Sequence, residues 1–326
     1  MAGLDLGFFL FAAITACIFA IMALGLYVQF SLAGLPNFGH VAFMAVASYA
    51  MAILVVRLSL PLPLAMLCGL LVAVALALLL GIPCLRLRAD YLAIATVAAG
   101  EMVRYLAMNL PDLTGGPLGS MAMLGPDQVA FYNLGWQAML DRVAAGIAHV
   151  TGTPVSRDAA AALIVFVVML LLLVFFARLE HSPWGRVLKA IREDDVAAAS
   201  VGKHVVAYKM QALILGAIIG GLSGMLLALQ IGVFSPDDYA PTLTFYAYLI
   251  LILGGMNRIW AIPLGAILFS LLYTGTRFLS FFPLSLFDSG SRAFLRLFLI
   301  GLMLVLFMAL RPQGVLGDRR QLLLEK

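Results

Sequence analysis

The chain has 326 residues, of which 64% are hydrophobic and only 11% are charged, with a formal net charge of +4. A soluble domain has roughly half apolar and a quarter charged residues, so this composition excludes an ordinary water-soluble protein and indicates that lipid covers much of the surface. The apolar runs are about 16–24 residues long and lack the two-residue alternation of barrel strands. We therefore predict an all-α, polytopic transmembrane helical bundle in a single domain, 1–326.

Several functional classes have no support in the sequence. There is no P-loop, no nucleophile elbow and no ligand pair of the HExxH kind. The three cysteines lie in or beside apolar runs, without the spacing of a metal or disulfide framework. The small net charge gives no reason to expect a nucleic-acid partner, because most basic residues fall in loops beside predicted spans. We predict no enzymatic site, no metal site and no cofactor in this chain.

Nine candidate spans follow one another along the chain. The second and seventh are short for a full crossing, which needs about 20 residues, so we expect them to be tilted, broken or re-entrant. The nine are predicted at 8–30, 41–56, 62–85, 90–109, 159–179, 208–231, 242–256, 259–281 and 293–310.

Loop charge predicts the orientation of these spans. With the N-terminus outside and the C-terminus inside, 13 of the 20 Lys and Arg residues fall on the cytoplasmic side, as the positive-inside rule favours. The stretch 110–158 then forms an external loop, and 180–207 is the longest internal loop. Spans one to four begin outside and spans six to nine begin inside, which predicts an inverted repeat. Nine unrelated helices are the alternative.

The internal loop 180–207 has the signals of a helical hairpin. Ser182 followed by Pro183 is typical of a helix start. A second short helix is expected from Asp194 or Asp195, and Gly202 is placed to end it. The loop could be an amphipathic connector on the lipid surface, but interfacial anchors are usually strongly cationic. Its mixed charge favours a docking element for a cytoplasmic partner.

Five stretches resemble, in order, the LivM-type permeases of high-affinity branched-chain amino acid ABC importers. One is the segment from Ser182 to Lys209, which is similar to the family's cytoplasmic signature, and the five stretches are specific only jointly. Ala89, Asn257 and Ala261 depart from the pattern, since the family often has Gly there. The other four stretches are 32–43, similar to GxxxxGHAAF; 85–96, similar to LRGxYLAIxT; 114–119, similar to TGGxxG; and 253–266, similar to LGGMGxxxGPxxGA.

The resemblance implies a permease subunit in the cytoplasmic (inner) membrane of a bacterium that translocates branched-chain or other neutral amino acids. It implies a sister LivH-type permease, two cytoplasmic ATPase subunits that bind ATP and Mg, and an external solute-binding protein. The hairpin 180–207 would then couple the permease to an ATPase, although exposed charges that are merely solvated remain an alternative. The coupling residues would be Trp184, Gly185, Arg186, Arg192, Glu193, Asp194, Ala198 and Gly202.

Candidate pathway residues come from three places. In the fourth span, Glu101 and Arg104 are three residues apart on one helical face, and they form either a structural ion pair or part of a polar path. A broken helix end near the second span could present backbone groups to substrate, or His40 could simply pack there. The turn after the fourth span could line an entrance or be a flexible turn. The candidates are Asn37, Gly39, His40, Thr96, Glu101, Thr114, Gly115 and Gly116.

The sixth span carries two interlocking GxxxG spacings, Gly216–Gly220 and Gly220–Gly224. Such spacings let helices approach closely, here within the subunit or against the sister permease. Other functions stay open: an importer of urea or short amides, and a gradient-driven secondary transporter. The latter would need no ATPase and would be expected to carry more carboxylates within its spans than Glu101 alone.

Overall fold

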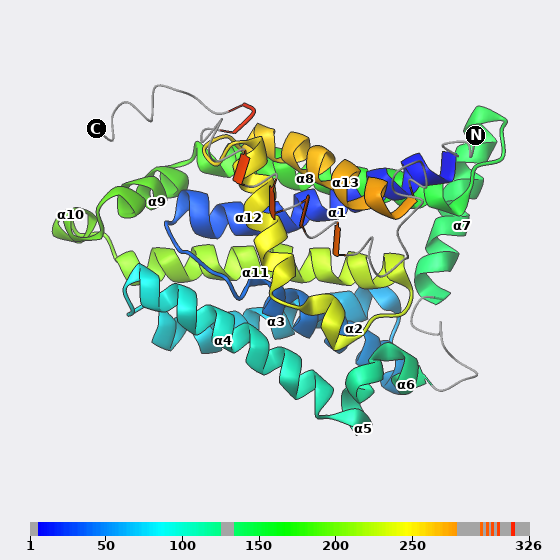
Figure 1. Ribbon diagram of the computed structural model, residues 1–326, viewed down its shortest axis with the longest axis horizontal. Helices are drawn as coiled ribbons and strands as arrows, with labels where there is room; N and C mark the ends of the chain where they lie inside the picture. The colour runs from blue at the N-terminus through cyan, green and yellow to red at the C-terminus, as the bar shows by residue number, and fades with distance from the viewer. Residues whose placement is uncertain are drawn as a thin grey trace.

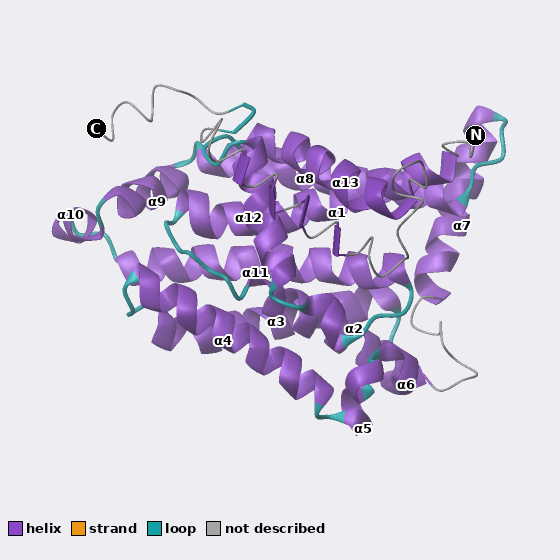
Figure 2. Ribbon diagram, viewed as in Figure 1, coloured by secondary structure: helices purple, strands orange, loops and turns teal. Residues whose placement is uncertain are grey.

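The computed structural model describes residues 6–124 and 134–278, with short pieces at 294–295, 298–299, 301–302, 305–306 and 314–316. All regular elements in these residues are helices, and none is a strand. Figure 2 shows this all-helical architecture. The predicted all-α polytopic bundle is therefore confirmed.

Among the described residues, six helices are long and apolar enough to cross a membrane, and they coincide with the first six predicted spans. The second span, predicted to be short, is a complete helix of 19 residues, because it continues to a C-cap at Ser59 beyond its most apolar part. The six are α1 (Leu6–Tyr27) with its π-helical extension η1 (Val28–Leu32), α2 (His40–Leu58), α3 (Leu62–Cys84), α4 (Ala89–Met108), α8 (Arg157–Glu180) and α11 (Val205–Ile231).

The seventh and eighth predicted spans form a bent pair. Helix α12 (Thr242–Gly254) is followed by η5 (Ile259–Ala261) and α13 (Ile262–Phe278), and the two helical stretches meet at 107°. Glycine permits this bend, because a Cβ on Gly265 would lie 2.2 Å from the carbonyl oxygen of Ile250. The pair is a broken span or a re-entrant loop. The ninth predicted span falls in a stretch of which the structure describes only isolated pairs of residues.

Helices α1 and α11 form the centre of the bundle, side by side in Figure 1. Of their most apolar windows, 72% of the residues are buried, against 28–33% for α3, α4 and α8. The outer helices therefore present apolar side chains, such as Leu71, Leu79 and Leu171, to a surrounding lipid phase. Helix α11 packs against α2 and α3, while α1 packs against α12 and α13. The first helix of each half thus packs against later helices of the other half, as two related halves would. The inverted repeat itself stays a prediction.

Short helices gather at the two opposite ends of the bundle (Figure 1). One end carries α9 (Pro183–Glu193) and α10 (Asp195–Ser200), where the sequence predicts a helical hairpin. The other end carries α5 (Pro111–Thr114), η2 (Gly116–Leu118), α6 (Ser120–Leu124) and α7 (Leu134–Thr151). The stretch 110–158 thus contains helices as well as loops. The two segments lie at opposite ends of the bundle, as an external loop and an internal hairpin would.

Candidate functional site

A buried polar cluster lies where α1 gives way to its π-helical end. Gln29, Asn37 and His40 are each 0–2% exposed. The side-chain amide of Asn37 donates to Oε1 of Gln29 at 2.9 Å, and Nδ1 of His40 lies 3.3 Å from the same oxygen. Nε2 of Gln29 donates to the backbone carbonyl of Leu213 on α11, at 3.1 Å. Gln29 therefore holds together the end of α1, the start of α2 and the middle of the bundle.

Glycines make the room that this polar cluster occupies. A Cβ on Gly216 would lie 2.3 Å from Nε2 of Gln29, and one on Gly220 would lie 2.8 Å from the His40 ring. The first GxxxG spacing of α11 thus accommodates polar side chains from the same chain. The second spacing serves helix packing, because a Cβ on Gly224 would lie 2.6 Å from the backbone of Met44 on α2. For these residues, close approach within the subunit is the reading that the structure supports.

The start of α2 lies inside the bundle, and side chains of other segments satisfy its free N–H groups. The N–H of Phe38 donates to Oγ1 of Thr96 on α4 at 3.1 Å. The N–H of Gly39 donates to Oδ1 of Asn37 at 2.9 Å. The N–H of Val41 donates to Oγ1 of Thr244 on α12 at 3.0 Å. Three separate segments therefore meet at one helix N-terminus, whose partial positive charge favours an anionic group.

Only glycine fits at residue 39, just before α2. A Cβ on Gly39 would lie 2.1 Å from the carbonyl oxygen of Thr96, so α2 and α4 are in backbone contact there. Four predicted pathway residues are thus brought together: Asn37, Gly39, His40 and Thr96. Gln29 and Thr244 complete the cluster, although the sequence did not single them out. A glutamine within an apolar span is itself a signal, because buried polar side chains there need partners.

Glu101 belongs to a different contact. Nη2 of Arg104 lies 2.6 Å from Oε2 of Glu101, as the spacing predicts, and Nη1 lies 2.8 Å from Oδ1 of Asp237 in η4 (Pro236–Tyr239). Arg104 therefore joins α4 to the segment before α12. These are the contacts of a structural ion pair, the first of the two alternatives. A role for Glu101 in the pathway stays a prediction.

The Thr-Gly-Gly turn lies at the end of the bundle that carries α5 and α6, apart from the polar cluster. Oγ1 of Thr114 lies 2.5 Å from the carbonyl oxygen of Ala107, which ties the turn to α4. Gly115 and Gly116 have φ angles of +81° and +61°, a backbone region that other residues rarely adopt. Just beyond, Ser120 exchanges two 2.9 Å hydrogen bonds with the backbone of Phe234. The turn is thereby fixed against the second half of the chain.

The hairpin has the caps that its sequence predicts. Oγ of Ser182 accepts from the N–H of Gly185 at 3.3 Å, and Oδ1 of Asp194 accepts from Val196 and Ala197 at 2.8 and 3.0 Å. Gly185 lies tightly against the end of α8, where a Cβ would come within 2.3 Å of the Glu180 carbonyl oxygen. Capping and close packing therefore account for Asp194 and Gly185.

The remaining predicted coupling residues divide into inward and outward groups. Trp184 donates from its indole nitrogen to Oε1 of Gln211 on α11 at 2.8 Å, and Ala198 is buried. Arg192 reaches inward, with Nη1 2.6 Å from the carbonyl oxygen of Ser31. Those that face solvent are Arg186, Glu193 and Gly202, the last with a φ of +79°. The apolar Val196 and Val201 of the hairpin are exposed as well.

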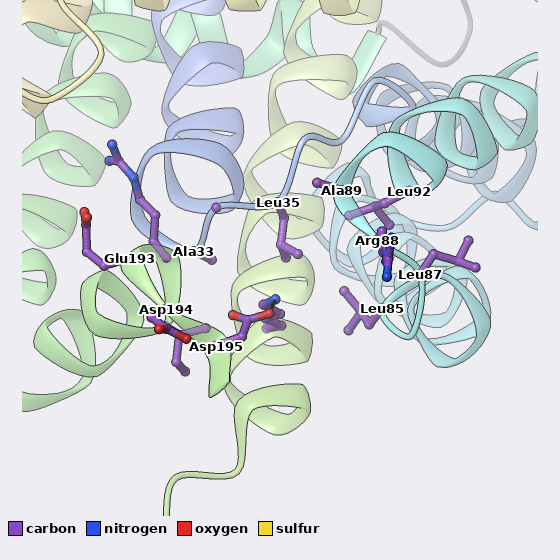
Figure 3. Close-up of a pocket in the computed structure, with 14 residues that line it drawn as sticks. Ala33, Leu35, Leu85, Leu87, Arg88, Ala89, Leu92, Glu193, Asp194 and Asp195 are labelled. Atoms are coloured by element: carbon purple, nitrogen blue, oxygen red, sulfur yellow. Dashed lines mark hydrogen bonds and ion pairs between the residues drawn. The ribbon is translucent and has the colours of Figure 1, made fainter. Parts of the chain in front are cut away.

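A recess of 390 Å³ separates the hairpin from the turn between α3 and α4. In Figure 3, Asp194 and Asp195 lie on one side of it and Arg88 and Leu92 on the other, with Leu35 between them. Asp195 forms an ion pair with Lys209 of α11. The hairpin therefore contacts α11 directly, while open space remains between it and α4.

The bundle, the buried helix start and the terminal hairpin together define a polytopic membrane permease. A family model described as the branched-chain amino acid transport system permease component matches residues 8–308. The chain belongs to this family, which confirms the resemblance to LivM-type permeases.

Relatives in three organisms are similar to the chain over most of its length. It is 32% identical over 316 residues to the LivM permease protein of the high-affinity branched-chain amino acid transport system of Salmonella typhimurium, and 31% identical to that of Escherichia coli. Each comparison covers 93% of this chain and 68% of the relative. A probable LivM protein of Methanocaldococcus jannaschii is 23% identical, over 93% of this chain and 91% of the relative. No solved structure matches the chain.

Proposed function

We propose that this chain is one membrane-spanning subunit of an ATP-driven importer of branched-chain amino acids in the inner membrane of a bacterium. The observation that carries the proposal is the family match across residues 8–308. A sister LivH-type permease would complete the pore. Two cytoplasmic ATPase subunits would bind ATP and Mg, and an external solute-binding protein would deliver the amino acid.

The hairpin α9–α10 is the proposed docking element for an ATPase subunit. Its exposed residues include Glu193, for which the described part of the chain provides no ion-pair partner, and the apolar Val196 and Val201. Charge together with a small apolar patch suits a protein partner better than a lipid surface. With an ATPase bound to it, the hairpin would lie in the cytoplasm and the beginning of α1 outside, which is the orientation that the distribution of basic residues predicts.

The proposed pathway passes the start of α2. An amino acid carries a carboxylate, and N–H groups at a helix N-terminus within a bundle suit such a group. In this structure the hydroxyls of Thr96 and Thr244 occupy those donors. During transport, α4 and α12 would move away from the start of α2, and the substrate carboxylate would replace the two hydroxyls. Asn37 and Gly39 would remain beside it.

Reconstitution tests this proposal. The chain would be purified with its sister permease and ATPases, placed in vesicles, and supplied with the binding protein and radiolabelled leucine. ATP-dependent uptake of leucine, competed by isoleucine and valine but not by urea, is the expected result. Uptake on an ion gradient without nucleotide would overturn the proposal in favour of a secondary transporter. If only urea or short amides compete, the substrate is one of these compounds and the assignment to branched-chain amino acids is wrong.

A further inference from the structure

The π-helical end of α1 lies between the hairpin and the buried start of α2. We propose that this segment, η1, transmits movement of α9 to the start of α2, and that Gln29 is its positioning residue. The proposal rests on the proposed function, since it assumes that α9–α10 receives an ATPase. Single π-turns within α-helices occur frequently at functional sites.

Two contacts join α9 to the chain on either side of Gln29, one at Tyr27 just before η1 and one at Ser31 within it. On one side, Oε1 of Glu180 is 2.7 Å from Nζ of Lys189, and Oε2 of Glu180 accepts from the Tyr27 hydroxyl at 3.1 Å. On the other side, Nη1 of Arg192 donates to the carbonyl oxygen of Ser31 at 2.6 Å. Tyr27 and Ser31 flank Gln29 in the chain. A displacement of α9 therefore pulls on both ends of the turn that carries Gln29.

The first attachment is strong because it involves a buried charge. Glu180 is only 6% exposed, and a carboxylate removed from water needs compensating partners. Lys189 and Tyr27 provide two of them. Releasing either partner would leave the buried Glu180 carboxylate with one partner fewer, so this carboxylate holds α9 and α1 together.

The hairpin is not held in the same way toward α4. Among the residues that the structure describes, no hydrogen bond or ion pair joins α9 to α4, and the recess of 390 Å³ lies between them. Helix α9 can therefore move relative to α4 without breaking a polar contact. Its movement is passed on to the segments that it does hold: α1 with η1, α8, α11, and the turn after α12, where Nη1 of Arg192 donates to Oδ1 of Asn257 at 3.3 Å.

The routes through α1 and α11 meet at one side chain. Trp184 links α9 to Gln211 near the start of α11, and Gln29 itself bonds the Leu213 carbonyl on the same helix. The other end of the Gln29 amide accepts from Asn37, which caps the start of α2 through the N–H of Gly39. Any rotation of η1 relative to α11 must break or stretch one of these bonds. Gln29 thus ties the position of α9 to the closed arrangement at α2.

The test uses the assembled importer with Arg192→Ala, Gln29→Leu and the milder Tyr27→Phe and Arg192→Lys. Three quantities are measured separately: copurification of the ATPases, basal ATP hydrolysis, and the stimulation of hydrolysis and uptake by loaded binding protein. We expect the ATPases to copurify, and stimulation to fall about 10-fold for Arg192→Ala and Gln29→Leu, within the usual range of coupling between sites. Arg192→Lys keeps one donor for the Ser31 carbonyl and should therefore retain part of the stimulation by loaded binding protein.

The control is Asp141→Asn at the opposite end of the bundle. Asp141 forms an exposed ion pair with Arg157 at 2.6 Å, and that guanidinium holds the pKa of the Asp141 carboxyl below its usual range. Loss of this pair removes a charge contact without touching η1, so stimulation should stay at the wild-type level.

The outcomes separate this inference from the proposed function. If the wild-type chain does not copurify with ATPases, the proposed function fails. If ATPases copurify but stimulation is unchanged in Gln29→Leu and Arg192→Ala, the transmission role of η1 is wrong. Should those two variants not fold, unchanged stimulation in Tyr27→Phe, which removes the bond to Glu180, overturns it equally. The double variant Gln29→Leu/Arg192→Ala gives a further check. If its loss of stimulation, expressed as free energy, equals the sum of the two single losses, the residues act independently, which would also contradict one shared route.

Discussion

Nη1 of Arg192 donates a hydrogen bond of 2.6 Å to the backbone carbonyl oxygen of Ser31, a residue 161 positions earlier in the sequence. The contact joins the hairpin α9–α10 to the π-helical end of α1. A side chain that the sequence places in a partner-binding surface is thereby used inside the subunit. Five consequences of the contacts around these helices can be measured.

Exposed groups of the hairpin should control docking of the ATPases. Glu193→Lys reverses a free charge and Val196→Asp removes part of the exposed apolar patch, so both should reduce copurification of the ATPases and lower uptake. Gly202→Trp should act in the same way, because its φ of +79° disfavours a side chain and the indole would cover the hairpin tip. Normal uptake by all three variants would rule out docking at this face.

The backbone contact between α2 and α4 should tolerate no side chain at residue 39. In Gly39→Ala the new Cβ would meet the Thr96 carbonyl oxygen at 2.1 Å, and overpacking of this kind costs about 1–3 kcal/mol. Thermal unfolding of the purified protein in detergent should move to lower temperature, and uptake should fall. Gly146→Ala is the matched control, because nothing lies within 4 Å of its Cβ. Equal melting temperatures for the two variants would contradict the contact.

The hydroxyl of Thr244 should matter much more than that of its neighbour Thr242. Thr244→Val leaves the buried N–H of Val41 without its acceptor, and an unsatisfied buried donor costs about 1–3 kcal/mol. Thr242→Val is the same change on the same helix at an exposed position and should be nearly neutral. Both are compared by thermal unfolding and by uptake. A similar effect of the two substitutions would show that the α2 start does not depend on Thr244.

The ion pairs of Arg104 should contribute to stability and leave substrate affinity alone. Glu101→Gln weakens one contact and Asp237→Asn the other. Because these side chains are partly exposed, each change should cost no more than about 1 kcal/mol. The apparent KM for leucine, measured in vesicles, should stay within a factor of about two, which is a small change in free energy. A large rise in KM for Glu101→Gln without loss of stability would instead place Glu101 in the pathway.

The small residue at position 216 should be required for the polar cluster. In Gly216→Ala the methyl group would lie 2.3 Å from Nε2 of Gln29, so the Gln29 side chain must shift and its bond to Leu213 is disturbed. We expect a loss of uptake and of stability together. The double variant Gly216→Ala/Gln29→Ala removes the clash and should recover stability but not uptake. If the double variant is as unstable as Gly216→Ala, another contact is responsible.

The spans could be predicted from the sequence because the thickness of a bilayer sets their length, whatever their neighbours are. The ends of the hairpin helices were also predictable, since Ser182 and Asp194 cap through residues two or three positions away. The polar cluster was predictable only in part. Asn37 and His40 stood out beside a proline, whereas the importance of Gln29 depends on a carbonyl 184 positions away. The inward direction of Arg192 is likewise set by long-range packing, which local pattern does not encode.

The acceptor for the Val41 N–H belongs to Thr244, a residue that lies 203 positions further along the chain. Hydrocarbon offers no substitute for such an acceptor. Lipid therefore cannot satisfy this N–H in place of Thr244, and the start of α2 is complete only once α12 has packed against it.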